Sequence, residues 1–428
     1  MYVRNKIAFH RVIHALLLAS IFFNTGCKQR EKILPENVPP SPLAKLYISF
    51  DSTQKITKSN YIDAQFDFFP SVPEEGDTIL SIAGKIKGRG NSTWVDMPKK
   101  PYKIKFNEKK GLFNLYAEKE WVLLANYADK TLMRNYLAYQ LAADIGSPYP
   151  PSLHYVEVYL NGKHQGNYLF TDQVEVGENR VNIPELTPSY NDTPFLTGGY
   201  LLEINARAPQ EDEPYFMGQK FPIQIKSPEA PSPEQLSYIT NYLQTAEQAL
   251  YSDDFADPVK GFRKYFDETS MIQWFIYSEL FKNIDSKDFS SVYFFKNRNG
   301  KLVMGPIWDF DLSAGNHIEH TESTDPNGWF VLNSYWFGRM YQDTAFRRNV
   351  KSHWNLYKPS INAVLSNIHK LSEYLDASQK ANFLLWPNFN DPSWAVPQGY
   401  LSFDAQVKYL TSFLERRMAW MDAAINNM

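Results

Sequence analysis

Three aspartates lie at the two ends of a predicted β-hairpin. Asp285 stands just before the hairpin, and Asp309 and Asp311 stand just after it. The hairpin is predicted from two β-rich runs and the turn between them: Val292–Lys296, Leu302–Ile307 and Asn299-Gly300. An Asn-Gly turn between such runs is the strongest short-range hairpin signal. Because a hairpin brings its ends together, the three carboxylates are expected to meet. They could hold a divalent cation or divide the roles of base and metal ligand; alternatively, they cap turns and helix starts.

A glycine-containing loop could bind an anion. A strand predicted over 78–87 ends at Gly88-Arg-Gly-Asn-Ser-Thr93. Backbone N–H groups in such a loop can form an anion nest, and Arg89 adds a fixed positive charge beside Asn91 and Ser92. A Gly-x-Gly run alone is weak evidence, since most such runs are tight turns. The loop is nevertheless a candidate phosphate site because of the strand that follows it.

That strand carries two lysines on one face. Over 98–106 the alternation places Lys103 and Lys105 on one side and the apolar residues on the other. A lysine pair in this pattern is usually a solvated strand face. Next to a phosphate-sized loop, one of the two becomes a candidate phosphate ligand. The sequence does not choose between them.

The elements that would position these residues follow from the hydrophobic periodicity. Strands are expected over 46–50, 62–69, 155–160, 166–172 and 198–205, and helices over 130–145, 233–251, 267–282, 344–375 and 404–424. Asp129 is expected to cap the first of these helices, and Asn161-Gly162 to turn a second hairpin. The stretch from Pro209 to Pro222 is expected to be irregular. Three prolines between Pro228 and Pro233 mark a boundary, because proline continues neither a helix nor a central strand.

The chain is therefore predicted to be an α+β protein with two parts. The β-rich part spans about 42–227 and the mainly helical part about 233–428, with the acidic hairpin opening toward their junction. This is the layout of a bilobal nucleotide enzyme, in which one lobe supplies the phosphate loop and a lysine and the other supplies carboxylates. The chain has 428 residues, 43% hydrophobic and 15% aromatic, enough to bury a sizeable core.

Composition excludes some functions and weakens others. The formal net charge of −3 gives no reason to expect nucleic-acid binding. The single cysteine rules out an internal disulfide framework, and the eight scattered histidines form no metal-ligand pattern. Carbohydrate binding is only weakly suggested by 27 tyrosines and 10 tryptophans, because dispersed aromatic residues are more often core.

The N-terminus is typical of an export signal. Arg4, Lys6 and Arg11 precede a mostly apolar run over 12–23, too short to span a bilayer, which leads into Thr25-Gly-Cys27. This ending resembles a bacterial lipobox, although Asn24 is unusual at its first position. We therefore expect residues 1–27 to form a lipoprotein signal peptide with its lipidated Cys27, and 28–41 a polar, Pro-rich tether. The alternative is an incidental cysteine after an ordinary signal peptide.

Several runs of the sequence together resemble a known family. They are Gly88-Arg-Gly-Asn-Ser-Thr-Trp94, Lys99-Lys-Pro-Tyr-Lys-Ile-Lys-Phe106, Arg134-Asn-Tyr-Leu-Ala138, Gly166-Asn-Tyr-Leu-Phe-Thr-Asp-Gln173, Gly198-Gly-Tyr-Leu-Leu-Glu203 and Trp308-Asp-Phe-Asp-Leu-Ser-Ala-Gly-Asn316. The sequence is similar in these runs to the CotH kinases, the spore coat protein H-like atypical protein kinases. The resemblance runs from about Leu46 to the C-terminus, within a domain expected over 42–428, and implies a divergent protein-kinase-like fold, ATP with Mg or Mn, and phosphate transfer to protein Ser or Thr.

The resemblance also implies roles for single residues. Asp285 matches the catalytic aspartate of an Asn-x-Asp motif, and Asp309 the metal-binding aspartate of a Trp-Asp-x-Asp motif, with Asp311 nearby. Lys103 or Lys105 falls where the family has its phosphate-pairing lysine. Two departures are visible. Ser290 stands where many members have an asparagine that could contact a second metal ion, and Asp288 is close enough to substitute. Asp172 stands where glutamate is usual.

Two functions from different classes follow. The first is an exported kinase, anchored to a cell-envelope membrane by lipid, that phosphorylates an exported or surface protein. The second is a non-catalytic surface protein that keeps the kinase-like fold for binding, because ATP is scarce outside the cytoplasm and a fold does not fix a function.

Overall fold

The computed structural model describes residues 41–192, 195–317, 321–391 and 399–428. The predicted signal peptide, Cys27 and nearly all of the tether lie outside these residues. Within them, no helix combines the length and the apolar character needed to cross a membrane.

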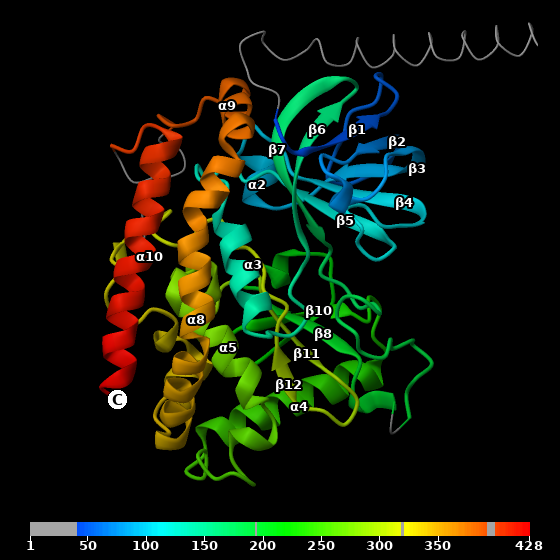
Figure 1. Cartoon of the computed structure of the whole chain (residues 1–428). Helices are drawn as coiled ribbons and strands as arrows, with labels where there is room; N and C mark the ends of the chain where they lie inside the picture. The colour runs from blue at the N-terminus through cyan, green and yellow to red at the C-terminus, as the bar shows by residue number, and fades with distance from the viewer. Residues whose placement is uncertain (1–40, 193–194, 318–320, 392–398) are drawn as a thin grey trace, which may run out of the picture.

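Seven strands form a closed barrel, drawn in blue to green in the upper part of Figure 1. In chain order they are β1 (Ala44–Ser49), β2 (Ile62–Phe69), β3 (Ile79–Gly88), β4 (Tyr102–Lys110), β5 (Glu118–Leu124), β6 (Leu153–Leu160) and β7 (Lys163–Asp172). Neighbours are antiparallel except for β1 and β6, whose parallel pairing closes the barrel. From Tyr102 to Phe106 every second side chain of β4 is buried, as period-two alternation requires. These side chains join a core that also holds Phe66, Trp121 and Phe170.

A five-stranded antiparallel sheet lies below the barrel in Figure 1. Its order is β12 (Leu302–Met304), β11 (Val292–Lys296), β8 (Tyr200–Ile204), β10 (Pro222–Ser227) and β9 (Tyr215–Met217). The central strand β8 is buried along its whole length. The sheet takes β8 to β10 from before the proline-rich boundary and β11 and β12 from after it. The two parts of the chain are therefore joined through one sheet.

Helices cover the sheet and flank the barrel. They are α2 (Ser92–Val95), α3 (Arg134–Asp144), α4 (Pro233–Tyr251), α5 (Glu268–Phe281), α6 (Thr321–Thr324), α7 (Tyr335–Met340), α8 (Thr344–Tyr374), α9 (Asp376–Leu385) and α10 (Phe403–Asn426). Helix α5 is buried on all sides from Ser270 to Phe281, as expected of a helix that is apolar all round. Helix α4 begins with a capping box between Ser232 and Gln235. Helix α9 packs on β7 of the barrel.

The structure confirms a mixed α+β chain, β-rich in its first half with helices toward the C-terminus. The predictions of strand 62–69 and helix 233–251 are confirmed at both ends. The turns at Asn161 and Asn299 are also confirmed, each with positive φ at the asparagine. Strand β5 and helix α9 were not predicted.

Three predicted elements are corrected. The helix expected from Lys130 begins at Arg134, because the Asp129 carboxylate accepts the Arg134 N–H at 2.7 Å and holds the preceding residues in a turn. The strand expected over 302–307 ends at Met304, since Pro306 has no N–H to extend the ladder. The stretch expected to be irregular, 209–222, contains β9.

Candidate active site

The hairpin of β11 and β12 brings the predicted acidic residues together. The Asn283 side chain accepts the Asp285 N–H at 3.2 Å and donates to the Asp309 carbonyl at 2.9 Å, so one amide ties both ends of the hairpin. The Ser291 hydroxyl donates to Oδ2 of Asp309 at 3.0 Å. Asp309 adopts a left-handed backbone with φ of 65°, which is uncommon outside glycine.

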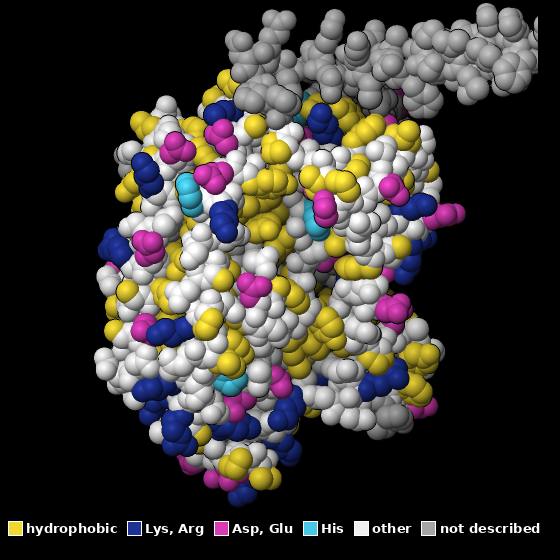
Figure 2. Space-filling model, viewed as in Figure 1, with side chains coloured by type: hydrophobic (Ala, Val, Ile, Leu, Met, Phe, Trp, Pro, Cys, Tyr) yellow, Lys and Arg dark blue, Asp and Glu magenta, His cyan; other side chains and the backbone are white. Residues whose placement is uncertain are grey.

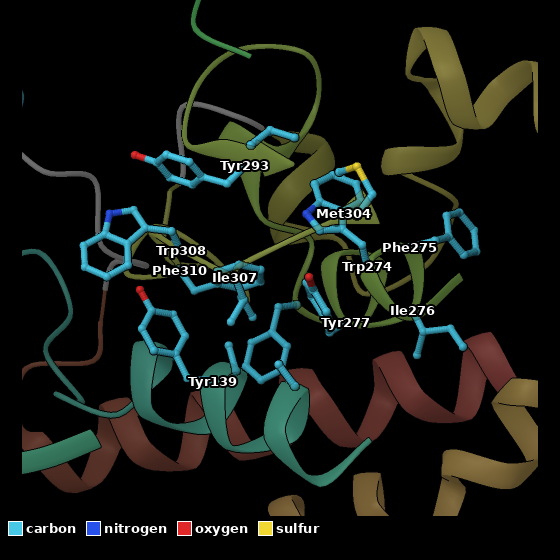
Figure 3. Close-up of a cluster of buried hydrophobic side chains, with 14 of the residues drawn as sticks. Tyr139, Trp274, Phe275, Ile276, Tyr277, Tyr293, Met304, Ile307, Trp308 and Phe310 are labelled. Carbon is cyan, nitrogen blue, oxygen red and sulfur yellow. The ribbon is translucent and has the colours of Figure 1, made fainter. Parts of the chain in front are cut away.

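Buried aromatic side chains pack near the acidic segment. Figure 3 shows Tyr139, Tyr293 and Trp308 projecting toward the same side of the core. The Tyr139 hydroxyl accepts the Asp309 N–H at 3.0 Å, which fixes the backbone of the aspartate from helix α3. The acidic segment therefore rests on a rigid core rather than on a free loop.

A cavity of about 1380 Å³ separates the barrel from the sheet, and the surface is hollowed between these two parts in Figure 2. The aspartates Asp285, Asp309 and Asp311 line it. So do four barrel-side residues, Lys58, Arg89, Asn91 and Ser92, and three residues of the sheet side, Glu203, Arg207 and Lys226. The predicted acidic cluster and the predicted phosphate loop thus face one space.

The carboxylates in this cavity destabilise one another's charges. Burial and the nearby Asp309 raise the pKa of Asp285 to about 7, against the opposing effect of the Arg207 guanidinium. Burial and Asp309 also raise the pKa of Asp311 well above its usual range. A cation placed among these oxygens would relieve the repulsion, as expected where a ligand completes the charge balance.

The donor set fits a divalent cation only in part. Among the described residues, no three His, Cys, Asp or Glu side chains are grouped closely enough to hold a metal ion alone. Mg²⁺ at phosphoryl-transfer sites is commonly held by one or two carboxylates, with phosphate oxygens and water completing the shell. Asp309 and Asp311 fit this arrangement, in which the phosphate brings the missing ligands.

The barrel wall of the cavity is positive. Between residues 58 and 135, the described lining residues include two cations, Lys58 and Arg89, and no carboxylate. The Arg89 guanidinium lies 5.4 Å from the centre of the Trp308 ring, and the described part of the chain offers it no ion pair. The Asn91 side chain accepts a hydrogen bond from Lys58 Nζ at 2.7 Å. Lys58 was not predicted, because it lies in a separate loop that only the fold brings to Asn91.

Three other predicted site residues do not line this cavity. Lys103 and Lys105 both pair with Glu120 on β5, Lys105 at 2.7 Å, so the lysine face of β4 is occupied by an ion-pair cluster. Asp288 accepts the Tyr335 N–H at 2.8 Å and so binds the start of α7. Lys103 and Lys105 are thus ion-paired on a strand face, and Asp288 contacts the first turn of a helix. The predicted lipidation residue, Cys27, lies outside the described residues.

The 88–93 loop, the Asp309–Asp311 segment and the aromatic residues Tyr293 and Trp308 thus surround one cavity. The family model described as CotH kinase protein matches residues 86–421. The chain belongs to the CotH kinase family. No curated protein matches it. Membership of this kinase-like family suggests ATP and a divalent metal ion as ligands.

Proposed function

We propose that this chain is a phosphotransferase that moves the γ-phosphoryl group of ATP to a Ser or Thr hydroxyl of an exported or surface protein. One observation carries the proposal: Arg89, whose cation has no ion-pair partner in the described part of the chain, and the carboxylates of Asp285, Asp309 and Asp311 line the same cavity. The negative charge of a triphosphate suits the cationic wall, and the positive charge of its bound cation suits the wall that carries the carboxylates. Phosphoryl transfer asks a protein mainly for positioning and charge neutralisation.

The proposed binding mode follows from the charges of the walls. The phosphates would lie against the 88–93 loop, with Arg89 and Lys58 as their cationic partners. Asp309 and Asp311 would hold Mg²⁺ or Mn²⁺. When bound, such a cation neutralises negative charge on phosphate oxygens. In this reading the barrel and the sheet with its helices act as the two lobes of a divergent kinase-like fold.

Asp285 is proposed to act on the acceptor. The acceptor hydroxyl gives its proton to the Asp285 carboxylate, and its oxygen forms a bond to the γ-phosphorus. The bond from that phosphorus to the bridging β-phosphate oxygen breaks, and ADP leaves. A carboxylate with a pKa raised to about 7 is a stronger base than an ordinary aspartate, which suits this role.

The proposal is tested by incubating the purified protein with γ-labelled ATP, Mg²⁺ or Mn²⁺ and co-exported proteins. Label on a protein Ser or Thr is the expected result. Nucleotide binding without any transfer would favour the alternative, a non-catalytic surface protein that keeps the fold, and no binding at all would reject both the kinase and a nucleotide-binding role.

We also propose that the protein is exported and anchored to a membrane of the cell envelope through lipid on Cys27. The support is the sequence alone: a short apolar segment after three basic residues, ending in Thr25-Gly-Cys27. Replacing Cys27 with Ser should release the protein from membranes or leave it unprocessed. A variant that is processed and membrane-bound like the parent would show that the anchor is wrongly assigned.

A further inference from the structure

Asn126 lies on the barrel wall of the cavity with an unused donor. It lies two residues after the end of β5, lines the cavity, and is only 4% exposed. Its Nδ2 group is buried and has no hydrogen-bond partner among the described residues. Buried amide donors are almost always paired in folded proteins, so an unpaired donor on a residue that lines a cavity points to a ligand that reaches it on binding.

The orientation of this amide is fixed by a relay of hydrogen bonds. The Phe310 N–H, which can only donate, binds Oδ1 of Asn135 at 2.7 Å. The Nδ2 of Asn135 must then face the other way, and it donates to Oδ1 of Asn126 at 3.2 Å. The Asn126 oxygen is thereby occupied, and its NH₂ group is the end left for a ligand. The ligand atom there must be an acceptor.

The relay also links the two walls of the cavity. Phe310 stands between Asp309 and Asp311, so Asn126 is tied to the backbone of the acidic segment through one intermediate side chain. Asn126 itself has a φ of 49°, a left-handed conformation that asparagine tolerates better than most residues. The amide is thus held at a set position relative to the carboxylates.

We infer that Asn126 donates a hydrogen bond to a phosphoryl oxygen of the ligand. This bond fixes the position of the phosphate chain between Arg89 and the Asp309–Asp311 pair. The inference rests on the proposed function. A phosphoryl oxygen fits because it is a strong acceptor and because the cavity residues between 58 and 135 bring two cations and no carboxylate to this wall. The sequence alone did not reveal Asn126, since nothing in its local pattern separates it from an ordinary turn asparagine.

The experiment measures binding of Mg²⁺–ATP and Mg²⁺–tripolyphosphate by calorimetry. Asn126→Asp replaces the NH₂ donor with a carboxylate oxygen, so affinity for both probes should fall about 10- to 100-fold. Asn126→Gly keeps the left-handed backbone and removes the donor without adding charge, and it should lower both affinities by a smaller factor. The matched control is Asn161→Asp, at an asparagine with φ of 45° in the turn between β6 and β7 whose Oδ1 accepts the Phe50 N–H. It should bind like the parent.

The outcomes separate this inference from the proposed function. If the parent binds both probes and the Asn126 variants bind equally well, water satisfies the amide and the inference is overturned while the kinase proposal stands. If only ATP affinity falls, Asn126 contacts the nucleoside and the phosphoryl assignment is wrong. If the parent binds neither probe, both fail. Circular dichroism melting checks folding, and if Asn126→Asp does not fold, the Asn126→Gly affinities decide between these outcomes.

Discussion

The guanidinium of Arg417 lies 2.6 Å from the carboxylate of Glu279, and neither side chain is exposed to solvent. This pair joins the last helix, α10, to the central helix α5. Glu279 also accepts the N–H groups of Phe330 and Leu332, at 3.0 Å and 2.8 Å, and Phe330 lines the cavity. The buried Arg417–Glu279 pair therefore helps to hold Phe330, and with it one part of the cavity wall, in place.

Removing one member of this pair should destabilise the protein strongly. Arg417→Ala leaves the Glu279 charge buried without its partner, and the free energy of unfolding should fall by about 3–5 kcal/mol. Urea denaturation measures the loss. The matched control is Lys380→Ala, which breaks a half-exposed pair with Asp376 of 2.7 Å and should change stability by less than about 1 kcal/mol. Equal effects for the two variants would contradict the structural role given to Arg417.

The sequence predicted the acidic site better than the basic one, for a physical reason. Asp285, Asp309 and Asp311 are joined through one short hairpin, and the geometry of a hairpin follows from local signals. Lys58 and Asn126 reach the cavity through the curvature of a closed barrel and a relay to another helix, which no local pattern encodes. The alternation of β4 correctly placed Lys103 and Lys105 on one face, but it could not show that Glu120 of the neighbouring strand covers that face.

Arg89 and Lys105 should differ in their effect on nucleotide binding. Arg89 faces the cavity without an ion-pair partner among the described residues, so Arg89→Ala should lower Mg²⁺–ATP affinity by about 10-fold or more. Lys105 is engaged with Glu120 outside the cavity, so Lys105→Ala should leave the affinity unchanged. Fluorescence titration of both variants measures this. A large loss for Lys105→Ala alone would mean that the lysine leaves Glu120 when nucleotide binds.

Variants of Asp309 and Asp288 should distinguish a residue that binds the cation from one that only caps a helix. Asp309→Asn keeps the shape of the side chain and removes its charge, so the rise in melting temperature caused by ATP with Mg²⁺ or Mn²⁺ should disappear. Asp288→Asn retains an oxygen that can accept the Tyr335 N–H, so that rise should persist. Thermal melting with and without EDTA gives the comparison. If Asp309→Asn is stabilised like the parent, the cation is held elsewhere.

Asp285 should destabilise the folded protein at neutral pH and above, although it acts as the base in the proposed reaction. Its folded pKa is about 7, and an unfolded aspartate titrates near 3.8. Between these values the folded state binds more protons than the unfolded state, so the contribution of Asp285 to stability falls as pH rises from about 4 to 7. In EDTA and without nucleotide, Asp285→Asn should therefore be more stable than the parent at pH 8, by about 1–3 kcal/mol. The difference should shrink as the pH is lowered toward 5.

The same Asp285→Asn variant should bind Mg²⁺–ATP nearly as well as the parent and transfer phosphate about 10²- to 10⁴-fold more slowly, because only the group that receives the hydroxyl proton has been lost. Denaturation at pH 5 and 8, nucleotide titration and labelled-phosphate transfer on one preparation give the three readings. An aspartate with a purely structural role would behave in the opposite way. Its loss would lower stability at pH 8 and would weaken binding and transfer together, because the segment between α5 and β11 would no longer hold its shape.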